Sequence, residues 1–265
     1  MDRRLPHISS RGVLAASVLA ALLLASCGMS NGGTSSSPTP STATSTTPAS
    51  ELAPTHGPYA PVIDPANFVT RVSNPFWPLQ PGTTYVYKGV RGSTPQTDTE
   101  IVTAQTKQIL GITSTVVRDT VSEHGAPVER TFDWYAQDRQ GNVWYMGEDS
   151  LEMRHGRLVR ASDSWEAGVD GAQPGIIVPA APTVGEAYRQ EYYPPGQALD
   201  EARVLSLAGS LQVPYGSYSG LLVTSERSPL EPQTEQKYYA PGVGEIAEKV
   251  VKGHHEQFQL VSVTH

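Results

Sequence analysis

The chain has 265 residues, with 19 Lys and Arg against 26 Asp and Glu, a formal net charge of -7 and a single cysteine. The acidic balance, together with the lack of a basic patch with interleaved aromatic residues, excludes the usual nucleic-acid binders, which need positive charge to attract phosphate. A single cysteine excludes a disulfide within the chain and a cysteine-rich metal site.

Residues 1–26 are predicted to be an export signal of the lipoprotein type. Three arginines near the start precede a short apolar run, from Val13 to Ser26, that is too short to span a bilayer. The run ends in Leu24-Ala25-Ser26-Cys27, which resembles a bacterial lipobox. This resemblance implies that Cys27 is acylated, for example with palmitate, and becomes the first residue of the mature protein.

A multiply acylated cysteine holds a protein stably at a membrane. We therefore expect an exported protein anchored to the outer face of the plasma membrane or to the outer membrane. An ordinary secretory signal with an incidental cysteine, or a twin-arginine signal at Arg3-Arg4, are the alternatives.

Residues 27–57 are predicted to be the acylated cysteine and a disordered tether. This segment is rich in Ser, Thr, Pro, Gly and Ala, which bury too little apolar surface to offset the entropy of ordering. The composition changes near Tyr59, and we expect residues 58–265 to form a single β-rich domain.

The stretch from Thr131 to Glu148 predicts a β-hairpin most clearly. Two aromatic-rich runs flank a polar turn from Asp138 to Asn142, where Gly141 can supply a positive φ. Further runs with strand character lie at residues 83–90, 99–110, 112–122, 152–159, 185–193, 202–213, 219–227, 235–239, 245–251 and 255–263. These runs predict a mainly β fold, a strongly curved antiparallel sheet, open or closed like a barrel.

A long stretch from Ser164 to Pro179 is expected to be an ordered loop, because it contains a tryptophan and three consecutive aliphatic residues. Two of its carboxylates, Glu166 and Asp170, are candidate ligands for a hard metal ion such as calcium, in an acidic group that also includes Glu148, Asp149 and Asp163. Solvated loop carboxylates are the competing interpretation, because the Asp-x-Asp-x-Asp-Gly spacing is absent.

Aromatic side chains are the other candidate site residues. Those that could line a ligand cavity are Trp134, Trp144, Trp165, Tyr192 and Tyr238. Core packing and edge stabilisation explain these aromatic residues more simply. No P-loop and no His-Glu-x-x-His motif is present, so we assign no catalytic residue and no cofactor.

Seven strings resemble a widespread family of bacterial secreted proteins and lipoproteins. They are NPFWPL (74–79), DWYAQDRQGNVWYMGE (133–148), SWEAGVDGAQPGII (164–177), YRQEYY (188–193), VPYGSY (213–218), PLEP (229–232) and KYYAPGVG (237–244). The resemblance implies one extracytoplasmic domain and brings no assigned activity. The last string is also similar to the final strands of envelope proteins of the lipoprotein-carrier type.

Three functions are open at this point. The first is a membrane-anchored binding module for an apolar or amphipathic ligand, or for an envelope protein, without nucleic-acid partners. The second is a hydrolase or metal-dependent enzyme that uses the acidic loop with His254 or His255. The third is a structural or interaction module without a ligand.

Overall fold

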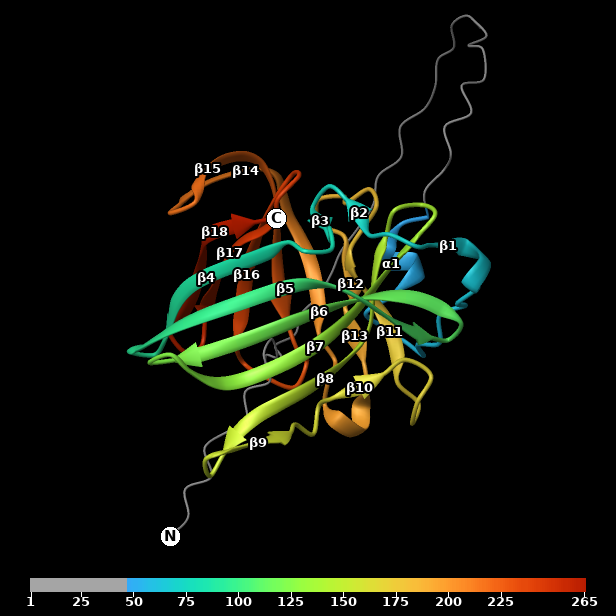
Figure 1. The fold of residues 1–265 in the computed structure, drawn as a ribbon. Coiled ribbons are helices and arrows are strands. Elements are labelled where there is room, and N and C mark those ends of the chain that lie inside the picture. The colour runs from blue at the N-terminus through green and yellow to red at the C-terminus, as the bar shows by residue number, and fades with distance from the viewer. Residues whose placement is uncertain (1–46) are drawn as a thin grey trace, which may run out of the picture.

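The fold is mainly β, as the sequence predicts. A computed structural model describes residues 47–265, so the predicted signal and Cys27 lie outside the described residues. Thirteen strands form one antiparallel sheet in the order β12-β14-β15-β16-β17-β18-β4-β5-β6-β7-β8-β11-β13. The sheet curls until its two ends meet, which gives a nearly closed barrel with one unsealed seam (Figure 1).

The elements follow the chain with few interruptions. The strands are β1 (Phe68–Val69), β2 (Ser73–Asn74), β3 (Trp77–Pro78), β4 (Thr84–Arg91), β5 (Thr94–Ile109), β6 (Ile112–Glu123), β7 (Ala126–Asp138), β8 (Val143–Arg154), β9 (Arg157–Arg160), β10 (Trp165–Glu166), β11 (Gln173–Val178), β12 (Ala187–Arg189), β13 (Glu191–Tyr192), β14 (Glu201–Val213), β15 (Gly216–Arg227), β16 (Thr234–Ala240), β17 (Gly244–Lys252) and β18 (Glu256–Thr264). Helical turns are α1 (Ala49–Leu52), η1 (Pro65–Asn67) and η2 (Pro194–Gly196). Within residues 47–265, no helix has the length and apolar character needed to cross a membrane.

The predicted hairpin is confirmed as β7 and β8. Its turn is organised by Asp138, whose Oδ1 accepts the backbone N–H groups of Gln140, Gly141 and Asn142 at 2.9–3.0 Å. Gly141 has φ +102°, a backbone conformation that is strained for any residue with a Cβ atom. The carboxylate therefore satisfies the donors of the turn and sets the register of the two strands.

The expected long loop is more regular than predicted. Residues 173–178 form β11, which pairs with β8, and the aliphatic residues Ile176, Ile177 and Val178 are buried there. Their continuous apolar run suits a strand that is covered on both faces. A short strand, β10, precedes it and also pairs with β8.

The seam lies within one short segment of chain. β12 pairs with β14, whereas β13 pairs with β11, and only Gln190 separates the two strands. The backbone N–H of Gln190 donates to the carbonyl of Asp200 at 2.7 Å. Because this segment changes its pairing partner at Gln190, the two ends of the sheet meet there without a continuous ladder.

The described part of the predicted tether is ordered, in contrast to the expectation for residues 47–57. Ala49 and Ala53 are buried, and the carbonyl of Ala53 accepts the backbone N–H of Arg189 at 2.8 Å. The Arg189 guanidinium donates to the carbonyls of Pro54 and Thr55, both at 2.8 Å. Specific contacts with the seam thus supply the ordering that composition does not predict. We call residues 47–59 the seam strap.

Candidate functional site

The barrel encloses a small, acidic cavity. Its volume is about 40 Å³, which is room for an ion or a few water molecules. The lining residues are Trp77, Leu79, Glu100, Val117, Asp119, Asp133, Tyr135, Tyr145, Glu148, Ile177, Gln190, Glu191, Asp200 and Glu226. Seven of these residues carry a carboxyl group, and no Lys, Arg or His is among them.

Strand alternation brings the carboxylates together. Asp133 of β7 lies opposite Glu148 of β8 and opposite Val117 of β6 in the sheet. Because neighbouring residues of a strand face opposite sides, Asp133 and Tyr135 face the cavity while Trp134 between them faces outward. The inner face of consecutive strands therefore collects acids that lie far apart in the sequence.

Burial raises the pKa of several of these acids. Desolvation, followed by repulsion from Asp98, raises the pKa of Asp119 well above its usual range. Desolvation, followed by repulsion from Glu191, does the same for Glu148 and for Asp200. The pKa of Glu191 is raised by burial to about 8, although a hydrogen bond from Trp165 partly opposes this. Burial and mutual repulsion therefore favour the protonated forms of these groups, whereas a positive charge nearby favours the ionised forms.

Two carboxylates have partners of their own. Glu226 contacts the ammonium group of Lys237, a side chain with no exposed surface, at 3.3 Å between Oε2 and Nζ. Its Oε1 accepts hydrogen bonds from Thr224 Oγ1 at 2.7 Å and from the Tyr239 hydroxyl at 2.8 Å. Asp133 accepts the hydroxyl of Tyr145 at 2.6 Å. Both acids therefore have donors of their own inside the barrel, namely Lys237, Thr224 and Tyr239 for Glu226 and Tyr145 for Asp133.

Two hydrogen-bond donors at the cavity have no partner among the described residues. Trp77 Nε1 and Gln190 Nε2 belong to side chains that are 6% and 3% exposed, and both residues line the cavity. A buried donor without a partner costs about 1–3 kcal/mol. An oxygen atom of a bound molecule or of water could accept these two N–H groups.

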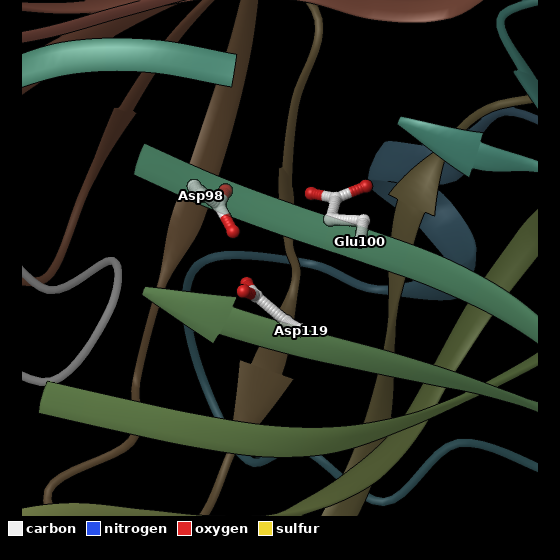
Figure 2. A group of neighbouring side chains, drawn as sticks. All are labelled: Asp98, Glu100 and Asp119. Carbon is white, nitrogen blue, oxygen red and sulfur yellow. The ribbon is translucent and has the colours of Figure 1, made fainter. Parts of the chain in front are cut away.

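One group of three carboxylates has metal-binding spacing. Oxygen atoms of Asp98, Glu100 and Asp119 all lie within 4.8 Å of one another. Figure 2 shows Asp98 and Glu100 on β5 and Asp119 on the neighbouring β6. Among residues 47–265, this is the one such group of three or more Asp, Glu, His or Cys side chains.

The five predicted aromatic site residues have different surroundings, and none is a lining residue. Trp165 contacts two lining residues of the cavity: its Nε1 donates to Glu191 and its ring packs edge-on against Tyr145. The other four contact Lys107 (Trp134), Asp138 and Phe68 (Trp144), Tyr59 and Arg189 (Tyr192), and Lys249 (Tyr238). Ligand binding by these five residues stays a prediction.

The acidic loop does not supply the metal group. Glu166 forms an ion pair with Lys107 at 2.7 Å, and Asp170 is an exposed turn residue with φ +50°. His254 and His255 are exposed at the turn before β18 and do not line the cavity. The carboxylates that gather instead come mostly from strands. Their sequence signal is an acid at alternate strand positions, as in Asp98 and Glu100, where an inward apolar residue is the usual expectation.

Comparison with solved structures finds two bacterial proteins. One, from Bacteroides fragilis, is inferred to be an exported protein and has a YmcC-like fold. The match has 11% sequence identity and a TM-score of 0.41, and it covers 72% of this chain and 99% of that chain. The other, from Parabacteroides distasonis, is described by inference as a lipoprotein; it has 11% identity and a TM-score of 0.40, covering 71% and 98%. These similarities concern the fold alone. A scan against protein-family models and a search of curated proteins find no match.

Proposed function

We propose that the protein is an extracytoplasmic binding protein that holds a small cationic ligand in the acidic cavity of its barrel. The observation that supports this most directly is the lining, with seven carboxyl groups and no cationic side chain. Uncompensated charges in such a place cost several kcal/mol each. Either protons or a bound cation supplies the compensation, and a bound cation displaces the protons.

The cavity revises the kind of ligand that we expected from the sequence. An apolar or amphipathic ligand needs a larger, mainly apolar pocket, of about 300 Å³ or more. The present cavity has about 40 Å³ and is lined half by carboxyl-bearing residues. A metal ion or a compact ammonium group fits both its size and its charge.

Membrane anchoring belongs to the same proposal. It is supported by the sequence Leu24-Ala25-Ser26-Cys27 and by the arginines and apolar run before it. With Cys27 acylated, the barrel is held at the membrane surface, where it meets cations of the envelope. The expected location is the cell envelope.

Native mass spectrometry of the full mature chain, extracted from membranes in mild detergent, tests the binding. We expect a small extra mass that disappears on denaturation or acidification. Thermal unfolding after chelation is then followed with added Ca²⁺, Mn²⁺, Mg²⁺ and putrescine, and at least one of these should raise the melting temperature. A single apo mass together with no thermal shift from any cation contradicts the proposal.

A matched pair of variants on β8 makes the test specific. Glu148 is 4% exposed and lines the cavity, whereas the adjacent Asp149 faces outward and pairs with Arg160 at 2.7 Å. Glu148→Gln should reduce the cation-induced shift, and Asp149→Asn should leave it unchanged. In the absence of cation, Glu148→Gln should be as stable as the wild type or more so, because it removes a carboxyl that burial forces to protonate.

A further inference from the structure

The geometry points to a specific divalent-cation site at Asp98, Glu100 and Asp119, occupied by a hard ion of the calcium type. This inference rests on the proposed function and names its ligand. Glu100 lies opposite Asp119, because Ile101 and Arg118 are paired in the β5–β6 ladder one residue further on. Asp98 is two residues before Glu100 and therefore faces the same side. The three carboxylates are thus held by adjacent strands and not by a loop (Figure 2).

The donor set selects the class of ion. All three groups offer oxygen atoms only, which suits Ca²⁺, Mg²⁺ or Mn²⁺ better than zinc or copper. Oxygen atoms on opposite sides of a Ca²⁺ ion are up to about 5 Å apart, since each Ca–O distance is about 2.3–2.6 Å. The observed oxygen atoms all lie within 4.8 Å of one another, which matches the spacing of oxygen ligands around a calcium-sized ion.

The two tyrosine hydroxyl groups of the neighbouring strand β4 donate to backbone carbonyls and not to the three carboxylates. Tyr85 and Tyr87 of β4 lie opposite Glu100 and Asp98. The Tyr85 hydroxyl donates to the Pro78 carbonyl at 3.2 Å, and the Tyr87 hydroxyl donates to the Glu245 carbonyl at 3.0 Å. A phenol has one proton to donate, so neither tyrosine supplies its proton to the carboxylates.

Two independent observations indicate that something binds beside these acids. Glu100 and Asp119 line the same cavity as Trp77 and Gln190, whose buried N–H groups have no acceptor among the described residues. A bare ion offers no acceptor, but an ion that brings water or another oxygen ligand does. Gln96, the previous inward residue of β5, is 3% exposed, and its Oε1 also has no partner in the described part of the chain. That amide oxygen is a further candidate ligand for a hard cation.

The test uses the full mature chain in detergent, freed of metal with a chelator. Calorimetric titration with CaCl₂ should show one high-affinity site, and Tb³⁺, which replaces Ca²⁺, should show emission sensitised by excitation of tryptophan. Asp119→Asn and Asp98→Asn should each weaken Ca²⁺ binding at least about tenfold, or about 1.4 kcal/mol. Asp149→Asn, on the outer face of β8, should bind Ca²⁺ like the wild type. Trp77→Phe should reduce the sensitised emission more than it reduces the affinity.

Folding of the variants is checked in chelator. Asp119→Asn and Asp98→Asn should melt no lower than the wild type, because each replaces a carboxyl group that is costly to ionise beside the other two with a neutral amide. Melting at unchanged temperature with lost Ca²⁺ binding supports the site. Undiminished Ca²⁺ binding by both variants overturns it.

The outcomes separate this inference from the proposed function. If no divalent ion binds, but putrescine stabilises the wild type and not Glu148→Gln, the metal site is wrong and the cationic-ligand proposal stands. If neither divalent ions nor putrescine binds, both are wrong.

Discussion

Lys237 provides the sharpest test of how the barrel tolerates its acidic interior. Its side chain has no exposed surface, and its Nζ lies 3.3 Å from Glu226 Oε2 and 3.5 Å from Glu248 Oε2. Lys237→Met keeps most of the volume and removes the positive charge. Glu226, at 5% exposure, then loses its ionic partner inside the barrel, whereas Glu248 is partly reached by solvent.

The magnitude follows from two independent estimates. Removing one partner of a buried ion pair costs about 3–5 kcal/mol. If Glu226 instead takes up a proton at pH 7, the cost is about 3.7 kcal/mol, because its ordinary pKa is about 4.3 and each pH unit is worth about 1.36 kcal/mol. We therefore expect the free energy of unfolding to fall by about 4 kcal/mol, which lowers the melting temperature by roughly 8–16 °C for a domain of this size.

Urea denaturation and thermal unfolding, each followed by circular dichroism, measure this loss. Lys249→Met is the matched control, because Lys249 is exposed on the neighbouring β17, and it should change the free energy of unfolding by less than about 0.5 kcal/mol. The loss in Lys237→Met should shrink to about 1 kcal/mol near pH 5, where protonation of Glu226 is cheap. Adding Glu226→Gln should restore part of the stability. A loss below about 1 kcal/mol at pH 7, or a loss independent of pH, refutes the reasoning.

Three further predictions concern the interior, a strand crossing and the seam. In chelator, the free energy of unfolding should fall as pH rises from about 5 to about 8. Burial raises the pKa of Glu191 to about 8 and of Glu235 to about 7, so the folded state binds more protons than the unfolded state in this window. Denaturation at a series of pH values that shows constant or rising stability contradicts this. Gly147→Ala should lower the free energy of unfolding, measured by urea denaturation, by about 2 kcal/mol or more, because φ is +131° and a Cβ would lie 2.4 Å from the Trp165 carbonyl oxygen. Gly156→Ala, at φ +77° in open space, should lower it by less. Equal losses would show that the close approach of Gly147 to the Trp165 carbonyl is unimportant. Arg189→Lys should increase protease cleavage within the seam strap at unchanged global stability, because lysine cannot donate to the carbonyls of Pro54 and Thr55 in the same forked geometry. Mass spectrometry of the fragments checks this, and an unchanged cleavage rate refutes it.

Local patterns in the sequence determined the strands and their turns. The hairpin around Gly141 is readable because alternation, aromatic residues and a polar turn are all properties of adjacent residues. For the same reason the prediction of a curved antiparallel sheet is confirmed, and the last five strands differ from their predicted bounds by only a few residues.

The candidate site could not be predicted from local sequence patterns in the same way. Asp133 is separated by many residues from its neighbours at the cavity, such as Asp200 and Glu226, and only the register of the closed sheet brings them together. The sequence drew attention to Glu166 and Asp170, because a run of acids in a loop looks like a site, but Lys107 from β5 takes Glu166 as an ion-pair partner. A contact of that kind depends on strand pairing, which no local pattern encodes.

Composition likewise predicted a disordered segment up to residue 57, although Arg189 holds residues 53–55 against the seam. By itself, the sequence determined what each segment prefers: an export signal with Cys27, a series of strands, and polar turns, since these depend on neighbouring residues. Only the tertiary structure decided which strand faces carry their acids inward, where the barrel remains unsealed, and that seven carboxyl groups share one small cavity. The physical reason is that burial and charge repulsion are properties of groups in space, and curling the sheet is what places those groups side by side.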